Sequence, residues 1–345
     1  MPLVSVILPA HDVAPWIEES VGSALGQTLA DLEVIAVDDG STDGTDERLA
    51  RLQASSKAAG RLVVLRQARA GAAAARNTAL ARARGRYVGF LDADDRWHPE
   101  NLERKVSVLE ADPDADLCLS GYRTIDAAGR ATGWAFQPAA PSLLPSDLLL
   151  ENPIGCGSVV VARRSAVEAA GRFDESLPAN VDIDLWLRIA ARRPECLRYV
   201  PEVLADYRRR PGQITGDWRE MARSRERVLE KMRDAAPEEL ARVERRAGAR
   251  YRLYLAELAL RTEDFAGARG LVARAWGSPR EVARTGRGWK LSALALASLL
   301  PRRWHAALLG AWRERRRRRA GVEAGREEAP PVPAAAPRPA RARGA

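Results

Sequence analysis

Apolar and polar positions in the first 92 residues alternate in a regular succession of buried strands and amphipathic helices. Near-continuous apolar runs such as LVSVILPA are typical of strands covered on both faces, and the segments between them have helical spacing of their apolar positions. Strands are expected at 3–10, 33–37, 61–67 and 86–92, with helices at 15–27, 45–53 and 71–84. This βαβαβαβ order predicts a parallel sheet with helices on both faces.

The pattern changes after residue 110. We expect further strands at 115–126 and near 157–163, followed by an amphipathic helix over 181–194. Residues 218–277 have a helical pattern throughout, and 254–276 resemble one tetratricopeptide-like helix pair. The last residues are Pro/Ala/Arg low complexity and should be disordered. The predicted organisation is therefore an α/β domain over 1–215, a helical region over 216–312 and a basic, disordered tail over 313–345.

The charge of the chain is concentrated at its end. The net charge is +9, but residues 313–345 contain 10 Arg and 4 Glu, so only +3 is left for the remaining 312 residues. Aromatic residues interleaved with basic ones are not evident in the body, so we expect no nucleic-acid partner. Three scattered cysteines disfavour a disulfide framework or zinc site. Without a signal-peptide pattern or an apolar run of about 18 residues, a cytoplasmic location is expected.

Residues 288–319 combine three tryptophans with Leu-rich turns and a run of arginines. This mixture suits a helix that lies in a membrane interface and is attracted to anionic lipid. It suits equally a helix packed on the rest of the protein and followed by a solvated charge run. Peripheral contact with the inner face of a membrane is thus one of two open interpretations.

Polar residues gather where the predicted strands end, which is the edge where α/β sheets bind ligands. They lie at 9–12 and 38–43 and at the acidic turn that contains Asp92, Asp94 and Asp95. Clustered carboxylates at the mouth of a buried strand repel one another unless a cation joins them. A hard divalent metal that bridges a diphosphate is one interpretation, and ordinary helix capping or Asx-turns are the other. Neither a Walker A loop nor a G-x-G-x-x-G fingerprint is present.

Six segments resemble, in order and at the expected spacing, the motifs of family 2 glycosyltransferases, which are inverting enzymes of the GT-A fold. They are VSVILPAHD, SVGSALGQT, LEVIAVDDGSTDGT, GAAAARNTAL, GRYVGFLDADD and GRFDESLPANVDIDLWLRIA, within residues 3–215. The resemblance implies a Rossmann-like, mostly parallel sheet and Mn²⁺ or Mg²⁺ as cofactor. It also implies transfer from a nucleotide-diphosphate sugar, with UDP favoured, to a saccharide or lipid-linked hydroxyl in cell-envelope polysaccharide or glycolipid assembly.

The resemblance also assigns the donor site. His11 stands where the family commonly has Tyr and Asp12 where Asn is usual, so the choice of base is less certain, and His11 could equally be an ordinary loop residue. Arg76 corresponds to a residue near the phosphates, with a helix-surface arginine as the alternative. Asp39 would accept a hydrogen bond from the base. The implied nucleotide-sugar set is Pro9, Ala10, His11, Asp12, Asp39, Arg76, Asp92 and Ala93.

The resemblance makes Asp94 the metal ligand, with Asp95 beside it, and Asp182 the base that takes the acceptor proton. Asp184 is the rival base, and a helix-capping role is its alternative. Arg210 replaces a His in the closing segment YRRRPGQIT, where it can pair with phosphate but cannot ligate a cation. A solvated turn is the other interpretation of these arginines.

A second class of function is a catalytically impaired binding or scaffold protein that recruits partners or membrane through its helical C-terminus. Val181, at the position of a usual Glu, and Arg210 favour it. A decayed site has no reason to keep four carboxylates, which favours the enzyme; these are Asp39, Asp92, Asp94 and Asp182. A nucleotidyltransferase would need a Gly-rich basic loop after the first strand, and LPAHDVAP has none.

Overall fold

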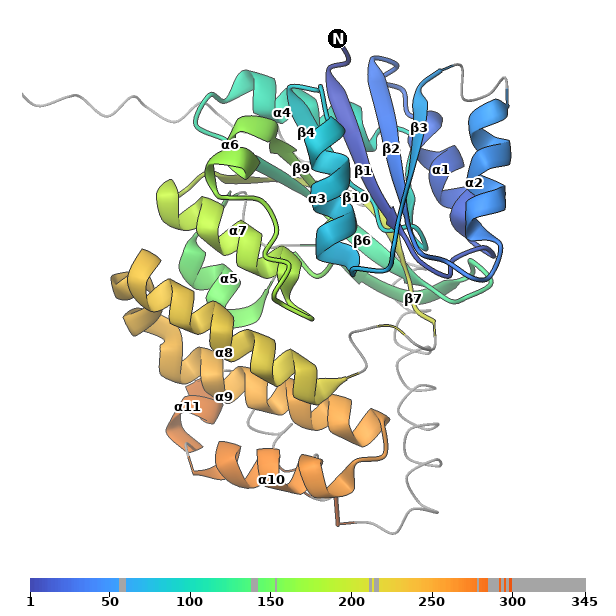
Figure 1. Ribbon diagram of the computed structural model, residues 1–345. Helices are drawn as coiled ribbons and strands as arrows, with labels where there is room; N and C mark the ends of the chain where they lie inside the picture. Colours follow the sequence, from blue (N-terminus) through green and yellow to red (C-terminus); the bar gives the residue numbers. More distant parts are fainter. Residues whose placement is uncertain are drawn as a thin grey trace, which may run out of the picture.

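The computed structural model describes residues 1–55, 60–137, 142–152, 154–210, 213, 217–277, 279–284, 292, 295, 298 and 299 (Figure 1). The predicted tail at 313–345 lies outside the described residues, and so does most of the segment 288–319 with its three tryptophans.

The βαβαβαβ order predicted for the first 92 residues is confirmed. The strands are β1 (Val4–Ala10), β2 (Leu32–Asp39), β3 (Leu62–Gln67) and β4 (Tyr87–Phe90), joined by α1 (Ile17–Leu25), α2 (Thr45–Ala54) and α3 (Ala72–Arg82). These four strands pair in parallel. Every residue of β2 and β4 is buried, which explains why the middle of β2 and all of β4 are apolar on both faces, with the carboxylates of β2 near its two ends.

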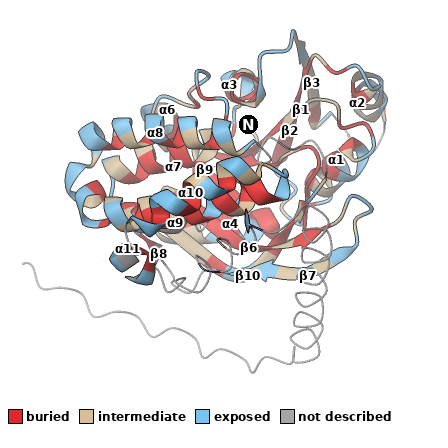
Figure 2. Ribbon diagram, turned by 90° about the horizontal axis from the view of Figure 1, so that it is seen from below, coloured by how far each residue is buried: buried red, intermediate tan, exposed pale blue. Residues whose placement is uncertain are grey.

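The first four strands lie in the spatial order β3-β2-β1-β4. The chain therefore runs outward from β1 to β3 and then returns to the other side of β1. Because such crossovers are right-handed, α1 and α2 cover one face and α3 covers the other, against β1 and β2 (Figure 2). The strand order reverses between β1 and β4. Open α/β sheets bind ligands at the carboxyl ends of the strands beside such a reversal, and the place where the ends of β1, β2 and β4 meet is called the crevice below.

The second half of the sheet is mixed. Its strands are β5 (Arg96–Trp97), β6 (Leu117–Ile125), β7 (Ala131–Phe136), β8 (Ser142–Leu143), β9 (Val160–Arg163) and β10 (Leu197–Arg208). β9 is inserted antiparallel between β4 and β6, while β10 runs parallel to β6 with two register shifts. Helix α4 (Asn101–Ala111) packs on β6, β9 and β10. Strand direction thus changes at β9, directly beside the crevice.

The remaining helices follow α4 along the chain, and the last four of them form the lower part of the molecule in Figure 1. They are α5 (Pro145–Glu151), the short 3₁₀ helix Gly157–Val159, α6 (Arg164–Ala169), α7 (Val181–Arg192), α8 (Trp218–Ala235), α9 (Pro237–Arg261), α10 (Phe265–Trp276) and α11 (Pro279–Arg284). α9 and α10 pack on each other as the predicted helix pair, and α8 packs on α7. A second hydrophobic cluster, centred on α9 and α10, supports this region.

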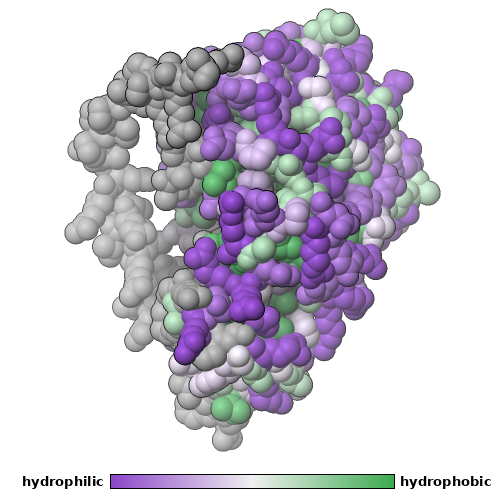
Figure 3. Space-filling model, turned by 90° about the vertical axis from the view of Figure 1, so that its left-hand side faces the viewer, coloured by the Kyte–Doolittle hydropathy of each residue, from purple (hydrophilic) through white to green (hydrophobic). Residues whose placement is uncertain are grey.

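None of the helices in the described part of the chain is both long enough and apolar enough to cross a membrane. The face shown in Figure 3 is largely hydrophilic, and its hydrophobic areas are small and separate. The interfacial helix considered for residues 288–319 falls mainly on residues that are not described.

Candidate active site

The acidic turn after β4 is folded inward, and Asp95 is its anchor. The Asp95 carboxylate is fully buried; its Oδ2 accepts a hydrogen bond from the Ser158 hydroxyl at 2.5 Å and its Oδ1 one from the Arg208 amide at 2.8 Å. Burial, followed by the charges of Asp94 and Asp92, raises the pKa of Asp95 well above its usual range. Asp95 therefore holds the turn in place from within, and a ligand would meet Asp92 and Asp94.

Asp92 pairs with Arg76, which reaches into the turn from α3. The Arg76 guanidinium lies 2.6 Å from Asp92 Oδ1 and 5.3 Å above the Phe173 ring, and the residue is only 7% exposed. The Asp92 amide donates to the Ser158 hydroxyl at 3.1 Å. Arg76 is thus part of the crevice, and the helix-surface interpretation does not hold.

Asp94 has a different counter-charge. Its Oδ2 lies 2.6 Å from Arg210 Nε, and the Arg210 guanidinium sits 4.9 Å from the centre of the Trp16 ring. Burial raises the pKa of Asp94 and the charge of Asp92 adds to this, while Arg210 opposes it. Ala93, between the two carboxylates, is buried. Arg210 therefore belongs to the acidic turn and is not a solvated side chain.

Arg208 is a residue of this centre that the sequence did not single out. It is 1% exposed; its Nε donates to the Asp94 carbonyl oxygen at 2.6 Å, and its guanidinium also pairs with Glu19 on α1. Arg209 is exposed and lies over Trp134. Side chains alternate along an extended strand, so Arg208 and Arg210 face the acidic turn and Arg209 faces away. That alternation was the available signal, together with the position of the three arginines at the end of an apolar strand.

The turns after β1 and β2 lie against each other. His11 Nδ1 is 2.9 Å from the Asp39 carbonyl oxygen, and Asp12 Oδ1 accepts a hydrogen bond from the Thr42 amide at 2.8 Å. The Asp12 backbone has a φ of 48°, which Asp tolerates better than most residues. Ala10 is buried and Pro9 partly so. The four residues predicted for the donor pocket after β1 therefore lie at the crevice edge, next to the acidic end of β2.

The Asp39 carboxylate is already well occupied. It accepts hydrogen bonds at 2.8 Å from the Gln67 side chain and from the amides of Ala70 and Gly71. Gly71 has a φ of 96°, which favours glycine, so this residue sets the path by which the chain enters α3. Asp39 thus ties β2 to α3. A carboxylate has about four acceptor positions, so one remains for a ligand.

The two carboxylates at the start of α7 have different surroundings. Asp182 is partly buried and accepts a hydrogen bond from the Ile183 amide at 2.8 Å. Burial raises the pKa of Asp182; the charge of Arg76 lowers it and that of Asp92 raises it. Asp182 therefore shares its electrostatic environment with the Arg76–Asp92 pair. The crevice brings α3, the acidic turn and α7 together.

Asp184 is fully buried and held by two cations. Its carboxylate lies 2.7 Å from Arg188 and 2.8 Å from Lys231 of α8. The capping position of α7 belongs to Asn180, with a φ of 58°, so Asp184 is not the cap. Both oxygens of Asp184 are engaged, which suits a structural role better than proton transfer.

A hard divalent cation fits the chemistry of the acidic turn, because Asp92 and Asp94 offer carboxylate oxygens. Each of these carboxylates nevertheless has an arginine partner, and among the described residues no group of three or more His, Cys, Asp and Glu side chains is arranged to hold a metal ion. The positive charge of Arg210 beside Asp94 Oδ2 opposes the binding of a metal ion there.

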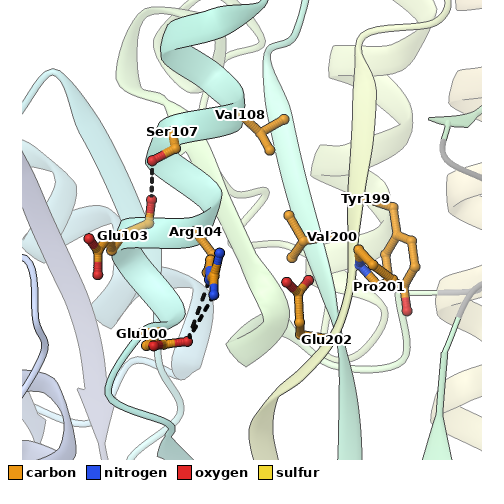
Figure 4. A pocket seen from close by; sticks show the side chains of 9 residues that line it. All are labelled: Glu100, Glu103, Arg104, Ser107, Val108, Tyr199, Val200, Pro201 and Glu202. Carbon is orange, nitrogen blue, oxygen red and sulfur yellow. Dashed lines mark hydrogen bonds and ion pairs between the residues drawn. The ribbon is translucent and has the colours of Figure 1, made fainter. Parts of the chain in front are cut away.

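An open groove of about 520 Å³ lies elsewhere, between α4 and β10. Figure 4 shows Glu100, Glu103 and Glu202 around it, with Arg104 paired to Glu100. None of the residues predicted for the site lines this groove. It is therefore separate from the crevice described above.

The fold and the crevice are those of an α/β enzyme that binds its ligands at the carboxyl ends of parallel strands. The model of the protein family described as "Glycosyl transferase family 2" matches residues 5–171 of the chain. TuaG of Bacillus subtilis (strain 168), whose name assigns it to teichuronic acid biosynthesis, is 36% identical over 209 residues, 60% of this chain and 79% of TuaG. The chain belongs to glycosyltransferase family 2, and the predicted enzyme class is confirmed.

Two solved structures share the fold. Residues 1–349 of TarS of S. aureus, in complex with UDP-GlcNAc, superimpose with a TM-score of 0.58 at 18% identity, covering 94% of this chain and 92% of that chain. The mannosyltransferase PcManGT of Pyrobaculum calidifontis, in complex with GDP-Man and Mn²⁺, also has a TM-score of 0.58, at 22% identity, covering 95% and 88%. The predicted GT-A architecture is confirmed. Some relatives are much longer, and the chain spans 32% of a Rickettsia felis glycosyltransferase.

Proposed function

We propose that the protein transfers a sugar from a nucleotide-diphosphate sugar to a hydroxyl acceptor with inversion, and that residues 1–215 form the catalytic domain. The observation that carries the proposal is the grouping of Arg76, Asp92 and Asp182, in which a partly buried carboxylate with a raised pKa lies beside an arginine–carboxylate pair. A general base with a raised pKa is well matched to taking a proton from a hydroxyl.

In the proposed reaction Asp182 accepts the proton of the acceptor hydroxyl while the acceptor oxygen forms a bond to the anomeric carbon. The bond from that carbon to the diphosphate oxygen breaks on the opposite side, and its electron pair leaves with the nucleoside diphosphate. Inversion follows from this single in-line displacement. Arg76, fixed against Phe173, is suited to hold the departing diphosphate because its planar guanidinium can donate two parallel hydrogen bonds.

The donor pocket that we propose consists of the carboxyl ends of β1 and β2, the turns that follow them, and the acidic turn after β4. Pro9, Ala10, His11 and Asp12 would lie against the nucleoside, with the remaining acceptor position of Asp39 open to the base. The complexes of TarS with UDP-GlcNAc and of PcManGT with GDP-Man support a nucleotide-sugar donor. The two donors carry different bases, uracil and guanine. We keep UDP as the favoured nucleotide.

Asp94, with Asp92 beside it, is the residue that would hold Mn²⁺ or Mg²⁺, and PcManGT with Mn²⁺ supports divalent-metal use. When bound, such an ion supplies positive charge to the departing diphosphate. The name of TuaG supports an acceptor in cell-envelope polysaccharide or glycolipid assembly, either a saccharide or a lipid-linked hydroxyl. The basic, tryptophan-containing segment 288–319 supports a cytoplasmic enzyme in peripheral contact with the inner face of the membrane.

Thermal-shift and calorimetric titrations with UDP, GDP, CDP and dTDP, each with Mn²⁺ and then with EDTA, test the proposal directly. One nucleotide is expected to stabilise the fold more than the other three, because a ligand that binds only the folded protein raises its melting temperature. ADP serves as a further nucleotide control. If no nucleotide raises the melting temperature in either condition, the chain is not a nucleotide-sugar transferase.

Arg76→Met is expected to move the acidic limb of the pH–rate profile to higher pH by about one unit or more, in addition to slowing transfer. The substitution removes the positive charge that lowers the pKa of Asp182 and leaves Asp92 unpaired, and both changes favour the protonated acid. Asp182 works as a base only when deprotonated, so more alkaline solution is then required. Arg48→Met, at an exposed pair with Glu18, is the matched control. An unmoved limb would show that Asp182 is not the group whose titration limits the rate.

A further inference from the structure

The acidic turn carries a cation of its own, the guanidinium of Arg210. Its Nε bonds to Asp94 Oδ2 at 2.6 Å, and the side chain stays 20% exposed while that of Asp94 is 12% exposed. Nε is one of the five N–H donors of arginine, and the other four are on the two terminal nitrogens. Among the described residues, neither terminal nitrogen makes a hydrogen bond. Within that part of the chain, the terminal nitrogens of Arg210 are therefore available as donors beside the acidic turn.

The position of Arg210 is built into the end of β10. Two residues earlier, Arg208 is fixed by hydrogen bonds to the Asp94 carbonyl oxygen and to Asp95, so the strand cannot slide along the acidic turn without breaking both. The Trp16 ring lies 4.9 Å from the guanidinium, and its indole N–H donates to the Ala127 carbonyl oxygen at 2.9 Å. Trp16 and Asp94 together leave the guanidinium little freedom to reorient.

A divalent cation and a guanidinium oppose each other at one carboxylate, because their two positive charges repel at short distance. An arginine held by a carboxylate through Nε can still present its terminal nitrogens to a phosphate, which guanidinium groups bind in a two-pronged geometry. Asp94 would then orient Arg210 instead of ligating a metal.

We propose that Arg210 is a phosphate-binding residue that allows this enzyme to bind a nucleoside diphosphate without a divalent metal, and that the charge of Arg210 weakens the binding of Mn²⁺ to Asp94. The inference rests on the proposed donor site. It assigns Arg210 a direct role on the donor, and it sets the charges of metal and arginine against each other at the same carboxylate.

The test is calorimetry on the full chain with UDP and with GDP, each in EDTA. The unmodified protein is expected to bind one of them in EDTA, and Arg210→Ala is expected to weaken that binding by about 10- to 100-fold, the usual consequence of losing a hydrogen bond between charged groups. Arg209→Ala, the exposed neighbour, should leave the affinity unchanged. Equal binding by Arg210→Ala and the unmodified protein would overturn the proposal.

Titration with Mn²⁺ alone provides a second readout that does not depend on activity. Arg210→Ala and Arg210→His are both expected to bind Mn²⁺ more tightly than the unmodified protein, because Asp94 is released and the imidazole is itself a metal ligand. Asp94→Ala should lose this site. Unchanged Mn²⁺ affinity in both Arg210 variants would overturn the proposed effect of Arg210 on metal binding.

The outcomes separate this inference from the proposed function. If the unmodified protein binds UDP or GDP only with Mn²⁺, the donor site stands and the role of Arg210 is overturned. If no nucleotide binds in either condition, both are overturned. Circular dichroism of each variant shows whether it is folded. If Arg210→Ala does not fold, the same affinities are measured with the Arg210→His variant.

Discussion

Changing Asp182 to asparagine is expected to lower the rate of sugar transfer by about 100- to 10,000-fold, which is the usual contribution of a general base. Asparagine has nearly the same shape, but its amide cannot accept the acceptor proton. Nucleotide binding should be unchanged, because none of the donor contacts proposed here is made by α7. Single-turnover rates and the calorimetric affinity for UDP, measured on the same preparation, separate the two effects.

Asp174→Asn is the matched control for Asp182→Asn. Asp174 lies just before α7 and pairs with Lys231 at 2.5 Å, so it is a nearby carboxylate without a part in the proposed chemistry. Its rate per folded molecule should be close to that of the unmodified enzyme. Near-normal turnover of the Asp182 variant would show that another residue is the base. Asp184 would then be tested first, despite its two ion pairs.

Replacing Asp206 with asparagine is expected to destabilise the fold by about 3 kcal/mol, near the lower end of the cost of breaking a buried ion pair. Asp206 is 1% exposed and pairs with Arg96, with Arg123 at 2.5 Å and with His98 at 3.3 Å. The lower end applies because the Arg123 side chain is 42% exposed and water can partly replace the carboxylate. Urea unfolding followed by circular dichroism measures the loss.

The same ion pairs give this effect a pH dependence. Although burial acts to raise the pKa of Asp206, hydrogen bonds from His98, Arg123 and Arg96 hold it well below its usual range. A carboxyl with a lowered pKa stabilises the fold above its unfolded pKa of about 3.9, and this stabilisation is lost as the pH falls below that value.

The difference between the unmodified protein and Asp206→Asn should therefore shrink as the pH falls below about 4. Glu18→Gln, at an exposed pair with Arg48, should cost about 0.5 kcal/mol or less. A loss no greater than that control would show that the Asp206 cluster does not stabilise the fold.

The strands of the first half of the sheet and their order along the chain could be predicted from the sequence. Strands β1, β2 and β4 are almost entirely buried, so their apolar runs stand out, and the polar residues at their carboxyl ends lie at one edge as the topology requires. The direction of β9 was not predictable, because an apolar run has the same composition whether it pairs parallel or antiparallel. The register shifts of β10 depend on its neighbours in the same way.

The partners of the acidic turn were likewise beyond the sequence. The motif located Asp92, Asp94 and Asp95, but Ser158 comes from a segment more than 60 residues away and Arg208 from one more than 110 residues away. Contacts at such separations depend on tertiary structure and leave no local pattern. Arg208 could have been found only by treating the three arginines as the end of a strand with alternating sides.

Helix α8 holds the start of α7 from two sides. Lys231 of α8 pairs with Asp184, two residues after Asp182, and the Asn180 side chain donates to the Met221 carbonyl oxygen of α8 at 3.0 Å. A shift of α8 would therefore move the helix that carries the proposed base. We expect that exchanging the helical region for that of a relative would preserve activity only if the residues at the start of α7 were exchanged with it.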